Sequence, residues 1–361
     1  MRTVLWWGRF DADYSRNRIL RGLLAELGWR VVDFQPRFSG LADWEAWLRR
    51  IAKPDLVWVP CFRQRDLAAA SRWARARRIP LLFDPLISAY DKQVFERAKL
   101  KPGSAAAQRL LAWERRLFER ADAVLADTEE HARFFVETFG IARDRVNVVY
   151  VGAEEALFRP DPTVSKHVHE ALDVLFFGSF IPLQGAPVIV EAARIYQGPP
   201  VNWTLIGAGP ELARCKSAAA GLPNIRFEAW LDYTALPARI RRADILLGIF
   251  GATLKAGRVI PNKVYQALAC GKPVLTRSSG AYPSALAAAG THGLIWVEAG
   301  NPASLAEAVR RLAIDSGGLK PLALAAAATY RDHFSNTMLK QQLRRALDGV
   351  FGARTDPADR A

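Results

Sequence analysis

Cysteine is scarce in this sequence, and the few cysteines form no pattern. Cys61, Cys215 and Cys270 are the only three among 361 residues. Their odd number and irregular spacing exclude a disulfide framework and are typical of a reducing cytosol. No apolar run approaches the ~20 residues that a membrane-spanning helix requires. We therefore expect a cytoplasmic protein without structural disulfides.

Signals for metal binding and secretion are lacking as well. The five histidines never occur at zinc-ligand spacing beside Cys, Asp or Glu, and the nearest approach, His167 and His169, falls in a polar connection. The first residues lack the apolar core and cleavage site of a signal peptide, because Arg9 and Asp11 interrupt them, and they are typical of a first strand. We expect no metal and no resident cofactor.

Positive charge is in excess. The chain has 50 Lys and Arg against 36 Asp and Glu, a formal charge of +14, which suits nucleic acid, an anionic membrane or an anionic small substrate. Much of the excess is arginine beside large aromatics on predicted helices, at residues 47–50, 72–78 and 109–120. Solvated helix faces explain most single arginines, but such a face also suits the headgroup region of a membrane.

No nucleic-acid-binding motif accompanies this charge. We therefore rank peripheral association with an anionic membrane above nucleic acid as a partner. We therefore expect a cytoplasmic protein that can associate with the inner face of the cell membrane.

Short β-branched runs alternate with helical stretches in both halves of the chain. This alternation is the signature of a parallel sheet with helices on both faces. The expected strands are residues 3–7, 30–34, 56–60, 81–83, 123–126 and 146–150, then 173–178, 203–207, 224–228, 245–248, 273–276 and 294–297. Two consecutive doubly wound units predict an α/β protein of two Rossmann-like domains that face each other across a cleft.

The polar residues 160–170 are the natural linker between these domains. The N-terminal domain is therefore predicted over residues 1–160 and the C-terminal domain over 161–334. A last helix, predicted over 335–352, follows the second domain, and we expect residues 353–361 to form a disordered tail.

Two glycine-bearing turns follow strands of the second half. At such turns, backbone N–H groups and helix N-termini bind phosphate, and glycine allows close approach. One turn spans residues 178–185 and includes Ser179 and Gln184, and the other is Gly207-Ala208-Gly209. Each is weak evidence by itself, because many α/β proteins have such turns for structural reasons.

The most informative stretch is residues 248–274. A glycine-rich loop with two cations leads into a short helix, which Gly271 ends before the next strand. The helix N-terminus and three cations converge where an anion would bind, which favours a phosphate site over an ordinary solvent-facing loop. The residues concerned are Lys255, Arg258, Pro261, Asn262, Lys263 and Gln266.

The end of this stretch resembles a known family. Residues 264–274, Val-Tyr-Gln-Ala-Leu-Ala-Cys-Gly-Lys-Pro-Val, are similar to the signature of family four (group 1) glycosyltransferases, usually Glu-Ala-x-Ala-x-Gly-x-Pro-Val. Further matches follow the family's order, at residues 121–128, 152–160, 178–185, 207–209 and 243–245. The resemblance covers about residues 120 to 310, and the first 110 match only as a generic Rossmann half.

The resemblance implies a GT-B fold whose C-terminal domain binds a nucleotide-diphosphate sugar and whose N-terminal domain binds the acceptor. It also implies no metal requirement, retention of anomeric configuration and a terminal helix that crosses back to the first domain. The donor-binding residues would be Gly178, Ser179, Gln184, Gly185, Gly207, Gly209, Lys255, Arg258, Pro261, Asn262, Lys263 and Gln266.

The sequence departs from the family in both donor loops. The two donor-loop glutamates fall on Arg258 and Gln266, and the usual Arg and Lys of the first glycine turn fall on Ser179 and Gln184. Our hypothesis is that the cations of residues 255–263 supply the missing charge. The competing interpretation is loss of catalysis.

Polar turns after the first and fourth expected strands would lie opposite the donor. They supply candidates for acceptor contact or proton handling, although such residues are as common as helix caps and turn residues. The acceptor-side candidates are Asp11, Arg16, Ser88 and Asp91. The catalytic candidates are Asp84, Arg258 and Lys263.

We therefore predict transfer of a sugar from a nucleotide-diphosphate donor to a glycan, glycolipid or other glycoconjugate acceptor, as in polysaccharide biosynthesis. A site rich in cations and glycine suits electrostatic stabilisation of a leaving phosphate. A sugar-nucleotide epimerase of the same fold is one alternative, but it requires acid–base carboxylates that this donor loop lacks. A catalytically inactive nucleotide-sugar-binding partner protein is the other.

Overall fold

The computed structural model describes residues 1–161, 171–287 and 292–352. The chain forms two compact units: unit 1 comprises Met1–Val151 and the chain from Asn336, and unit 2 comprises Gly152–Ser335. The division falls after Val151, whereas the sequence suggested residue 160. Most of the expected linker, with His167 and His169, and the expected tail 353–361 lie outside the described residues.

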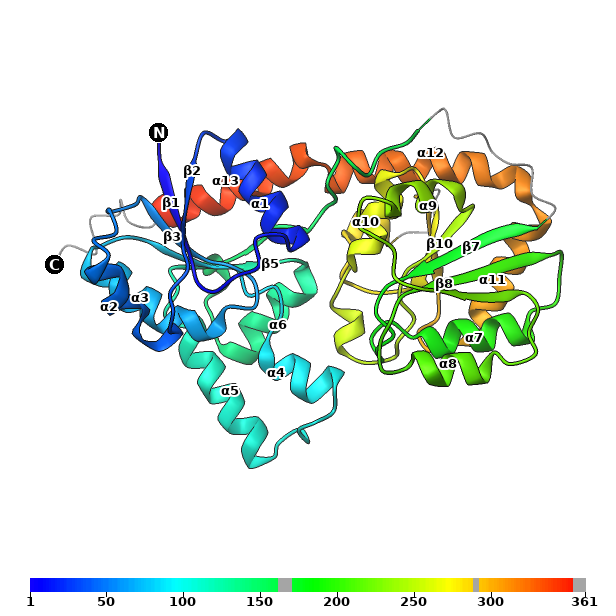
Figure 1. Cartoon of the computed structure of the whole chain (residues 1–361), viewed down its shortest axis with the longest axis horizontal. Coiled ribbons are helices and arrows are strands. Elements are labelled where there is room, and N and C mark those ends of the chain that lie inside the picture. The colour runs from blue at the N-terminus through cyan, green and yellow to red at the C-terminus, as the bar shows by residue number, and fades with distance from the viewer. Residues whose placement is uncertain (162–170, 288–291, 353–361) are drawn as a thin grey trace. The chain divides into compact units, whose positions relative to one another are not determined.

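Unit 1 contains a six-stranded parallel sheet in the order β2-β1-β3-β4-β5-β6 (Figure 1). All six strands were predicted from apolar runs, and β3, β4 and β5 are buried along their whole length because helices cover both faces. The strands are β1 (Thr3–Trp7), β2 (Arg30–Phe34), β3 (Leu56–Val59), β4 (Leu81–Phe83), β5 (Ala123–Ala126) and β6 (Val146–Val148).

The helices of unit 1 include the last helix of the chain, α13, which packs against α1, β5 and β6. In that contact Gln342 accepts the backbone N–H of Tyr150 at 3.1 Å. The helices are α1 (Ser15–Glu26), α2 (Ala42–Leu48), α3 (Leu67–Ala76), α4 (Ala89–Asp91), α5 (Ala105–Phe118), α6 (Glu129–Phe139) and α13 (Asn336–Gly352), with short segments η1 (Ser39–Leu41), η2 (Gln64–Asp66), η3 (Lys92–Glu96) and η4 (Arg143–Arg145).

Helix α6 shows how local signals set helix ends. The Thr128 hydroxyl accepts the backbone N–H of His131 at 3.1 Å, which satisfies a donor of the first turn. Gly140 takes a left-handed conformation with φ of 69° and ends the helix. Both signals were visible in the sequence, and the predicted helix over residues 129–139 is confirmed.

Unit 2 contains a second six-stranded parallel sheet, in the order β12-β11-β10-β7-β8-β9 (Figure 1). Its fully buried aromatic residues include Phe176 and Trp203 on the central strands. The strands are β7 (Leu172–Phe177), β8 (Val201–Ile206), β9 (Ile225–Glu228), β10 (Ile245–Leu247), β11 (Val274–Arg277) and β12 (Leu294–Val297).

One helix of unit 2, α12, was not predicted. Its sequence is rich in Ala and Leu without a polar stripe, so it lacks the amphipathic period on which such predictions rest. The helices are α7 (Ala186–Ile195), α8 (Leu212–Ala218), α9 (Leu236–Arg242), α10 (Asn262–Ala269), α11 (Pro302–Ile314) and α12 (Leu319–Thr329), with short segments η5 (Lys255–Gly257), η6 (Ser284–Leu286), η7 (Ser316–Gly318) and η8 (Tyr330–Phe334).

Candidate functional site

The two glycine-rich loops of unit 2 start on neighbouring strands. From β7 and β10, which pair in parallel with Phe176 opposite Leu247, the connections run outward in opposite directions. Ligands of doubly wound sheets bind at such a reversal point, at the carboxyl ends of the strands. The loops of residues 178–185 and 248–261 both begin there.

Glycine allows these loops to pack against each other and against the turn after β8. A Cβ atom on Gly185, where φ is +70°, would lie 2.6 Å from the backbone nitrogen of Gly251 in the other loop. A Cβ atom on Gly207, where φ is +141°, would lie 2.0 Å from the carbonyl oxygen of Gly178. Loop packing therefore requires both glycines, and contact with a donor stays a prediction for them.

Lys263 extends from the first turn of α10 toward the loop after β7. Its ammonium donates a hydrogen bond of 2.6 Å to Oε1 of Gln184 and lies 3.6 Å from the ring centroid of Phe176. It would also lie 3.0 Å from a Cβ atom on Gly178. Three of the predicted donor-site residues, Gly178, Gln184 and Lys263, are thus brought together.

The surroundings of Lys263 make its ammonium receptive to an anion. The residue is only 5% exposed, and burial lowers the pKa of Lys263 well below its ordinary value because the charged form loses hydration. In the described part of the chain no carboxylate is bonded to it, since its partners are an amide oxygen and aromatic faces. A diphosphate bound beside Gly178 would supply the missing counter-charge.

Gln266 lies about one turn further along α10, in a chain of polar side chains. Its amide donates to the hydroxyl of Tyr233 at 3.4 Å, and that hydroxyl donates to Oε1 of Glu154 at 3.1 Å. Glu154 thus provides a carboxylate that Gln266 itself lacks. Sequence reasoning missed Tyr233 and Glu154 as site residues because no local spacing links these three segments.

Arg277, at the end of β11, holds the loop between β10 and α10. Its guanidinium donates to the carbonyl oxygens of Gly251 at 2.7 Å and Thr253 at 3.3 Å. Lys255 is buried in the short segment η5, and Arg258 follows it half-buried. Both predicted cations therefore belong to an anchored turn, and the sequence contained no signal for its anchor.

The remaining donor-side candidates lie at loop ends. Pro261 is the residue before α10 and Asn262 is its first residue, without a side-chain cap at this end. Ser179 and Gly209 are exposed in their turns. The roles of these four residues toward a donor stay predictions.

In unit 1, Arg16 and Asp84 form a buried ion pair. Arg16 Nε donates to both carboxylate oxygens of Asp84, at 2.9 and 2.8 Å, and Nη1 donates to the carbonyl oxygen of Val149 at 2.9 Å. Both side chains are fully buried. The pair ties α1 to the carboxyl end of β4, so both residues have a structural role. Catalysis by Asp84 and acceptor contact by Arg16 stay predictions.

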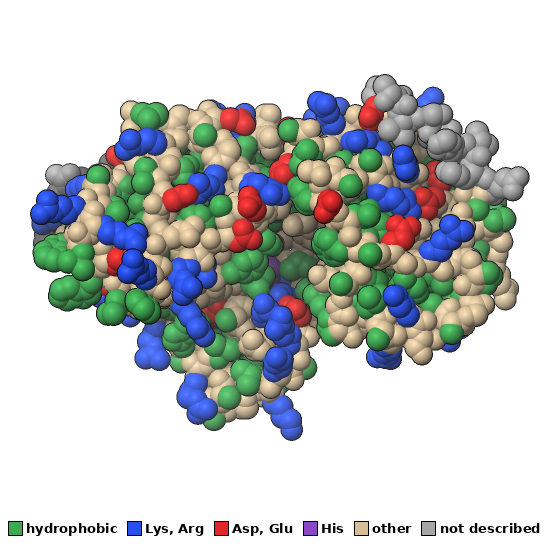
Figure 2. All heavy atoms as spheres, in the orientation of Figure 1, with side chains coloured by type: hydrophobic (Ala, Val, Ile, Leu, Met, Phe, Trp, Pro, Cys, Tyr) green, Lys and Arg blue, Asp and Glu red, His purple; other side chains and the backbone are tan. Residues whose placement is uncertain are grey.

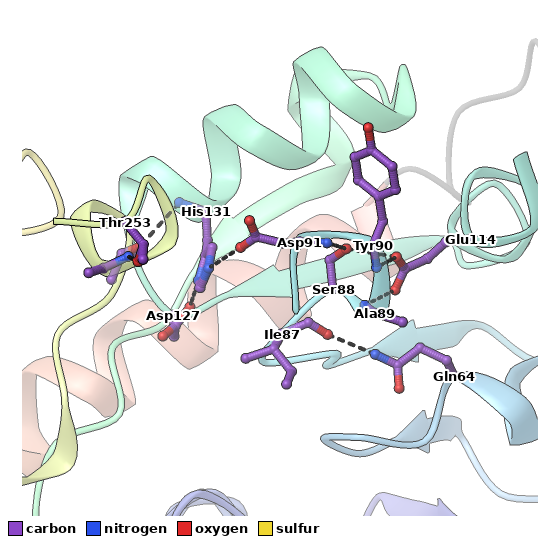
Figure 3. Close-up of polar contacts among 12 residues, drawn as sticks. Gln64, Ile87, Ser88, Ala89, Tyr90, Asp91, Glu114, Asp127, His131 and Thr253 are labelled. Carbon is purple, nitrogen blue, oxygen red and sulfur yellow. Dashed lines mark hydrogen bonds and ion pairs between the residues drawn. The ribbon is translucent and has the colours of Figure 1, made fainter. Parts of the chain in front are cut away.

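The other acceptor-side candidates occupy turns and helix caps. The Ser88 hydroxyl accepts the backbone N–H of Asp91 at 3.0 Å and donates to Oε2 of Glu114 at 2.7 Å, all within the buried cluster of Figure 3. Asp11 is exposed, and its carboxylate accepts the backbone N–H of Asp13. Ser88 and Asp91 therefore lie together, and Asp11 stabilises a separate turn.

His131 lies between two carboxylates in the same region (Figure 3). Its Nδ1 is bonded to Asp127, and its Nε2 lies 3.8 Å from Oδ2 of Asp91. Burial disfavours the imidazolium, but Asp127 and Asp91 together outweigh it through charge and hydrogen bonding and raise the pKa of His131 to about 9. Sequence reasoning gave His131 no role, because Asp91 belongs to a distant segment.

This raised pKa predicts a pH-dependent stability. Because the folded pKa exceeds the unfolded value near 6.5, the His131 contribution is complete below pH 6.5 and is lost as the pH rises to about 9. We expect the free energy of unfolding to fall by an amount on the order of 1–3 kcal/mol over that range. His131→Gln should remove this pH dependence. Thermal melts of both proteins from pH 6 to 9 test this, and parallel curves would contradict it.

A hollow of about 650 Å³ lies at the reversal point of the unit 1 sheet, between β1 and β3. Three arginines and one tryptophan line it together with polar side chains. It shares Gln64, Arg65, Leu110 and Trp113 with an adjoining hollow of about 420 Å³ that reaches Ala68 and Leu117. The lining residues of the first hollow are Arg9, Ser39, Phe62, Arg63, Gln64, Arg65, Ala89, Gln93, Leu110 and Trp113.

The arginines of this hollow differ in how they are bonded. Arg63 pairs with Asp66 at 2.6 Å, whereas Arg9 and Arg65 are exposed and their guanidinium groups have no acidic partner among the described residues. These residues were not predicted from the sequence, because the loops after β1 and β3 meet only in the folded sheet. An anionic group in the hollow would meet two available guanidinium groups.

The described residues contain neither a metal-binding cluster nor a membrane-spanning helix. No group of three or more His, Cys, Asp and Glu side chains lies close enough to hold a metal ion. Within the same ranges, no helix has the length and apolar character to cross a membrane.

Each half of the chain matches a model of glycosyltransferases. The model described as "Glycosyl transferase 4-like domain" matches residues 9–152, and that described as "Glycosyl transferases group 1" matches residues 171–315. Together the two models account for most of the chain. The chain belongs to the group 1 glycosyltransferases, and the resemblance seen in the sequence is confirmed.

Curated relatives and solved structures agree with this assignment. A D-inositol 3-phosphate glycosyltransferase of Acidothermus cellulolyticus is 28% identical over 256 residues, 65% of this chain and 53% of the relative. One from Catenulispora acidiphila is 27% identical over 310 residues, 77% and 70% of the two chains. This chain thus spans about half the length of the first relative.

The fold comparison covers nearly the whole chain. The Anabaena HepE protein in complex with UDP-glucose superposes with a TM-score of 0.72 at 16% identity, over 96% of this chain and all of that one. With two doubly wound parallel sheets, the predicted GT-B fold is confirmed.

Proposed function

We propose that this protein transfers a sugar from a nucleotide-diphosphate donor to an acceptor. The observation that carries the proposal is the buried ammonium of Lys263, bonded to Gln184 beside Gly178. A cation held in this way is preorganised for the charge that develops on a departing diphosphate. HepE, of similar fold, forms complexes with UDP and UDP-glucose, so UDP-sugars are the first donors to test.

Each part of the unit 2 site has a role in this proposal. Lys263 binds the diphosphate and stabilises the leaving phosphate, and Gln184 orients its ammonium. Arg258 adds positive charge from the preceding loop, and Gln266 bonds donor hydroxyls, with Glu154 reached through Tyr233. Because protein cations supply this charge, we infer that the reaction needs no metal. Retention of the anomeric configuration is what the family resemblance implies, and proton NMR of the product checks it.

We propose further that the acceptor carries an anionic group, bound in the arginine-lined hollow of unit 1. Arg9 and Arg65 are its two arginines whose guanidinium groups have no acidic partner among the described residues. The curated relatives are named for a phosphate-bearing acceptor, inositol 3-phosphate. A glycan or glycolipid with a phosphate or carboxylate near the accepting hydroxyl would satisfy the same chemistry.

A paired-acceptor assay tests this function. With a UDP-sugar donor, inositol 3-phosphate should give product faster than free inositol, and Arg65→Gln should raise the KM for the phosphorylated acceptor roughly tenfold, because one charge-assisted bond is lost. Donor hydrolysis without acceptor should stay unchanged in that variant. Arg75→Gln, an exposed arginine of α3 outside the hollow, is the matched control.

The outcomes also separate the alternatives. Mass spectrometry of the products distinguishes a transferred or released donor sugar, which supports transfer, from an altered sugar, which assigns the chain to the epimerases. UDP binding without any turnover would identify a catalytically inactive binding protein. Equal use of inositol and its phosphate would contradict the anionic-acceptor proposal and leave the donor proposal intact.

A further inference from the structure

Five large apolar side chains lie on the surface of unit 1 within eleven residues. Each is more than 60% exposed, whereas in the described part of the chain most apolar side chains of this size are buried. We call this set, which consists of Phe38, Leu41, Trp44, Trp47 and Leu48, the α2 surface. Figure 2 shows apolar side chains gathered over α2, with Lys and Arg side chains around them.

The structure of α2 turns these side chains outward. Ala42 and Ala46, one turn apart, face the core of unit 1 and are fully buried. Trp44, Trp47 and Leu48 occupy the opposite side of the helix, since residues three or four apart share a face. A helix whose outer face is exposed only to solvent ordinarily has polar residues on that face.

Neighbouring elements hold this surface in place. Arg72, from α3, donates to both carboxylate oxygens of Asp43 at 2.7 Å and to the carbonyl oxygen of Gly40 at 2.9 Å. The guanidinium of Arg77 lies over the ring of Trp73, a buried residue of α3. A hollow of about 350 Å³ lies between Trp44, Trp47 and the α3 side chains. The surface is therefore an anchored part of the fold.

The charges around the α2 surface are predominantly positive. The two acidic residues of helix α2 already form ion pairs. Asp43 pairs with Arg72 at 2.7 Å, and Glu45 pairs with Arg49 at 2.5 Å. The exposed Arg37 and Arg50 flank the segment on either side. Tryptophan with arginine at the edge is the combination that suits a lipid headgroup region, where the rings enter the interface and the guanidinium groups meet phosphates.

We propose that the α2 surface docks unit 1 onto an anionic lipid bilayer. A second copy of this chain is the weaker candidate, because two arginine-flanked surfaces on chains of formal charge +14 would repel each other. The sequence pointed to three basic segments as a possible membrane face, and of these only residues 47–50 contain an exposed tryptophan, Trp47. Phe38, Leu41 and Trp44 were not predicted to take part.

The location also bears on the acceptor. Ser39 lines the arginine hollow, and its neighbour Phe38 belongs to the α2 surface. Docking would bring the mouth of that hollow to the headgroup region, where a lipid-linked acceptor resides. This last step rests on the proposed function, whereas membrane binding itself is measured without any turnover.

The test is co-sedimentation of the full chain with vesicles. Vesicles of phosphatidylglycerol and phosphatidylcholine should bind the protein, phosphatidylcholine alone should bind it weakly, and added salt should weaken the binding. The double variant Trp44→Ser with Trp47→Ser should lose on the order of tenfold or more in partitioning. Arg37→Gln with Arg50→Gln should lose the preference for anionic lipid.

Matched control variants distinguish binding through the α2 surface from nonspecific apolar adsorption and from nonspecific electrostatic attraction. Ile314 and Leu324 are at least 60% exposed in unit 2, and Ile314→Ser with Leu324→Ser should bind vesicles as the unmodified protein does. Arg214→Gln with Arg226→Gln removes two exposed unit 2 arginines and should keep the lipid preference. Unchanged melting temperatures would show that the variants are folded.

Three results would overturn the proposal. The first is that the unmodified protein does not bind anionic vesicles. The second is that the tryptophan variant binds them as well as the unmodified protein does. Light scattering could instead reveal a dimer that the tryptophan variant loses, which would assign the α2 surface to a second copy of the chain.

Discussion

Replacing Asp84 by Ala should destabilise the protein by about 3–5 kcal/mol, as expected when one member of a buried ion pair is removed. Arg16 would remain fully buried, with one guanidinium bond to the carbonyl of Val149 and no carboxylate bonded to it, since Asp127 acts on it only through its charge. Urea unfolding monitored by circular dichroism measures the change, because the midpoint falls with the free energy of unfolding.

The control is an exposed pair in the same unit. Arg21 and Asp33 form an ion pair of 2.6 Å at the surface, and Asp33→Ala should cost less than about 1 kcal/mol. If Asp84→Ala proves as mild as Asp33→Ala, the structural role is wrong. Asp84→Asn keeps the size of the side chain but also removes the charge, so it should destabilise as well. Turnover lost at temperatures where this variant remains folded would support the catalytic prediction for Asp84.

Replacing Lys263 by Met should weaken UDP binding roughly 10- to 100-fold, because one charge-assisted bond to phosphate is lost. The same change should leave the free energy of unfolding equal or higher, by about 0–2 kcal/mol, since a buried ammonium without a carboxylate partner is removed. Isothermal titration calorimetry and urea unfolding measure the two effects. Improved stability with lost binding is the signature of a residue placed for a ligand.

Protonation gives a second readout for Lys263. Its lowered folded pKa means that the unfolded chain binds more protons above that pKa, so its contribution to stability rises with pH up to about 10.5. A bound diphosphate favours the ammonium, so UDP binding should take up protons above the folded pKa. Calorimetry in buffers of different ionisation enthalpy detects this uptake, which Lys263→Met should lose.

The matched control for this variant is Lys272→Met. Lys272 lies just beyond α10, outside the predicted donor site, and is not fully buried. The Lys272→Met variant should bind UDP as the unmodified protein does. Unimpaired UDP binding by Lys263→Met would sink both the donor site and the relocated-charge hypothesis, whereas a comparable loss in both variants would show a general charge effect.

Most of the fold was accessible from the sequence. The strands were found because each carries its own apolar run, and α6 because Thr128 and Gly140 mark its ends within the local chain. Helix α12 was missed because its Ala-rich stretch has no polar stripe. The position of the donor loop was also local information, since its glycines, cations and Gly-Lys-Pro-Val ending are contiguous.

The contacts that give these residues their chemistry were decided only by the tertiary structure. Lys263 meets Gln184 across 79 positions of the chain, and Arg16 meets Asp84 across 68. Such pairs have no period or spacing to detect, because the order of strands in the sheet determines which loops become neighbours. The hollow with Arg9 and Arg65 and the outward face of α2 were not predicted for the same reason, because both depend on which segments become neighbours in the folded chain.

The sequence by itself therefore determined the two doubly wound domains, the family and the stretch that holds the predicted donor site, because hydrophobic period, caps and contiguous motifs are local properties. Burial is not local. Only the folded chain decided that Lys263 is a buried cation bonded to an amide, that Asp84 serves an internal ion pair, and that two tryptophans of α2 face outward. The donor loop remains the predicted centre of the protein, now with Lys263 as its best-defined residue.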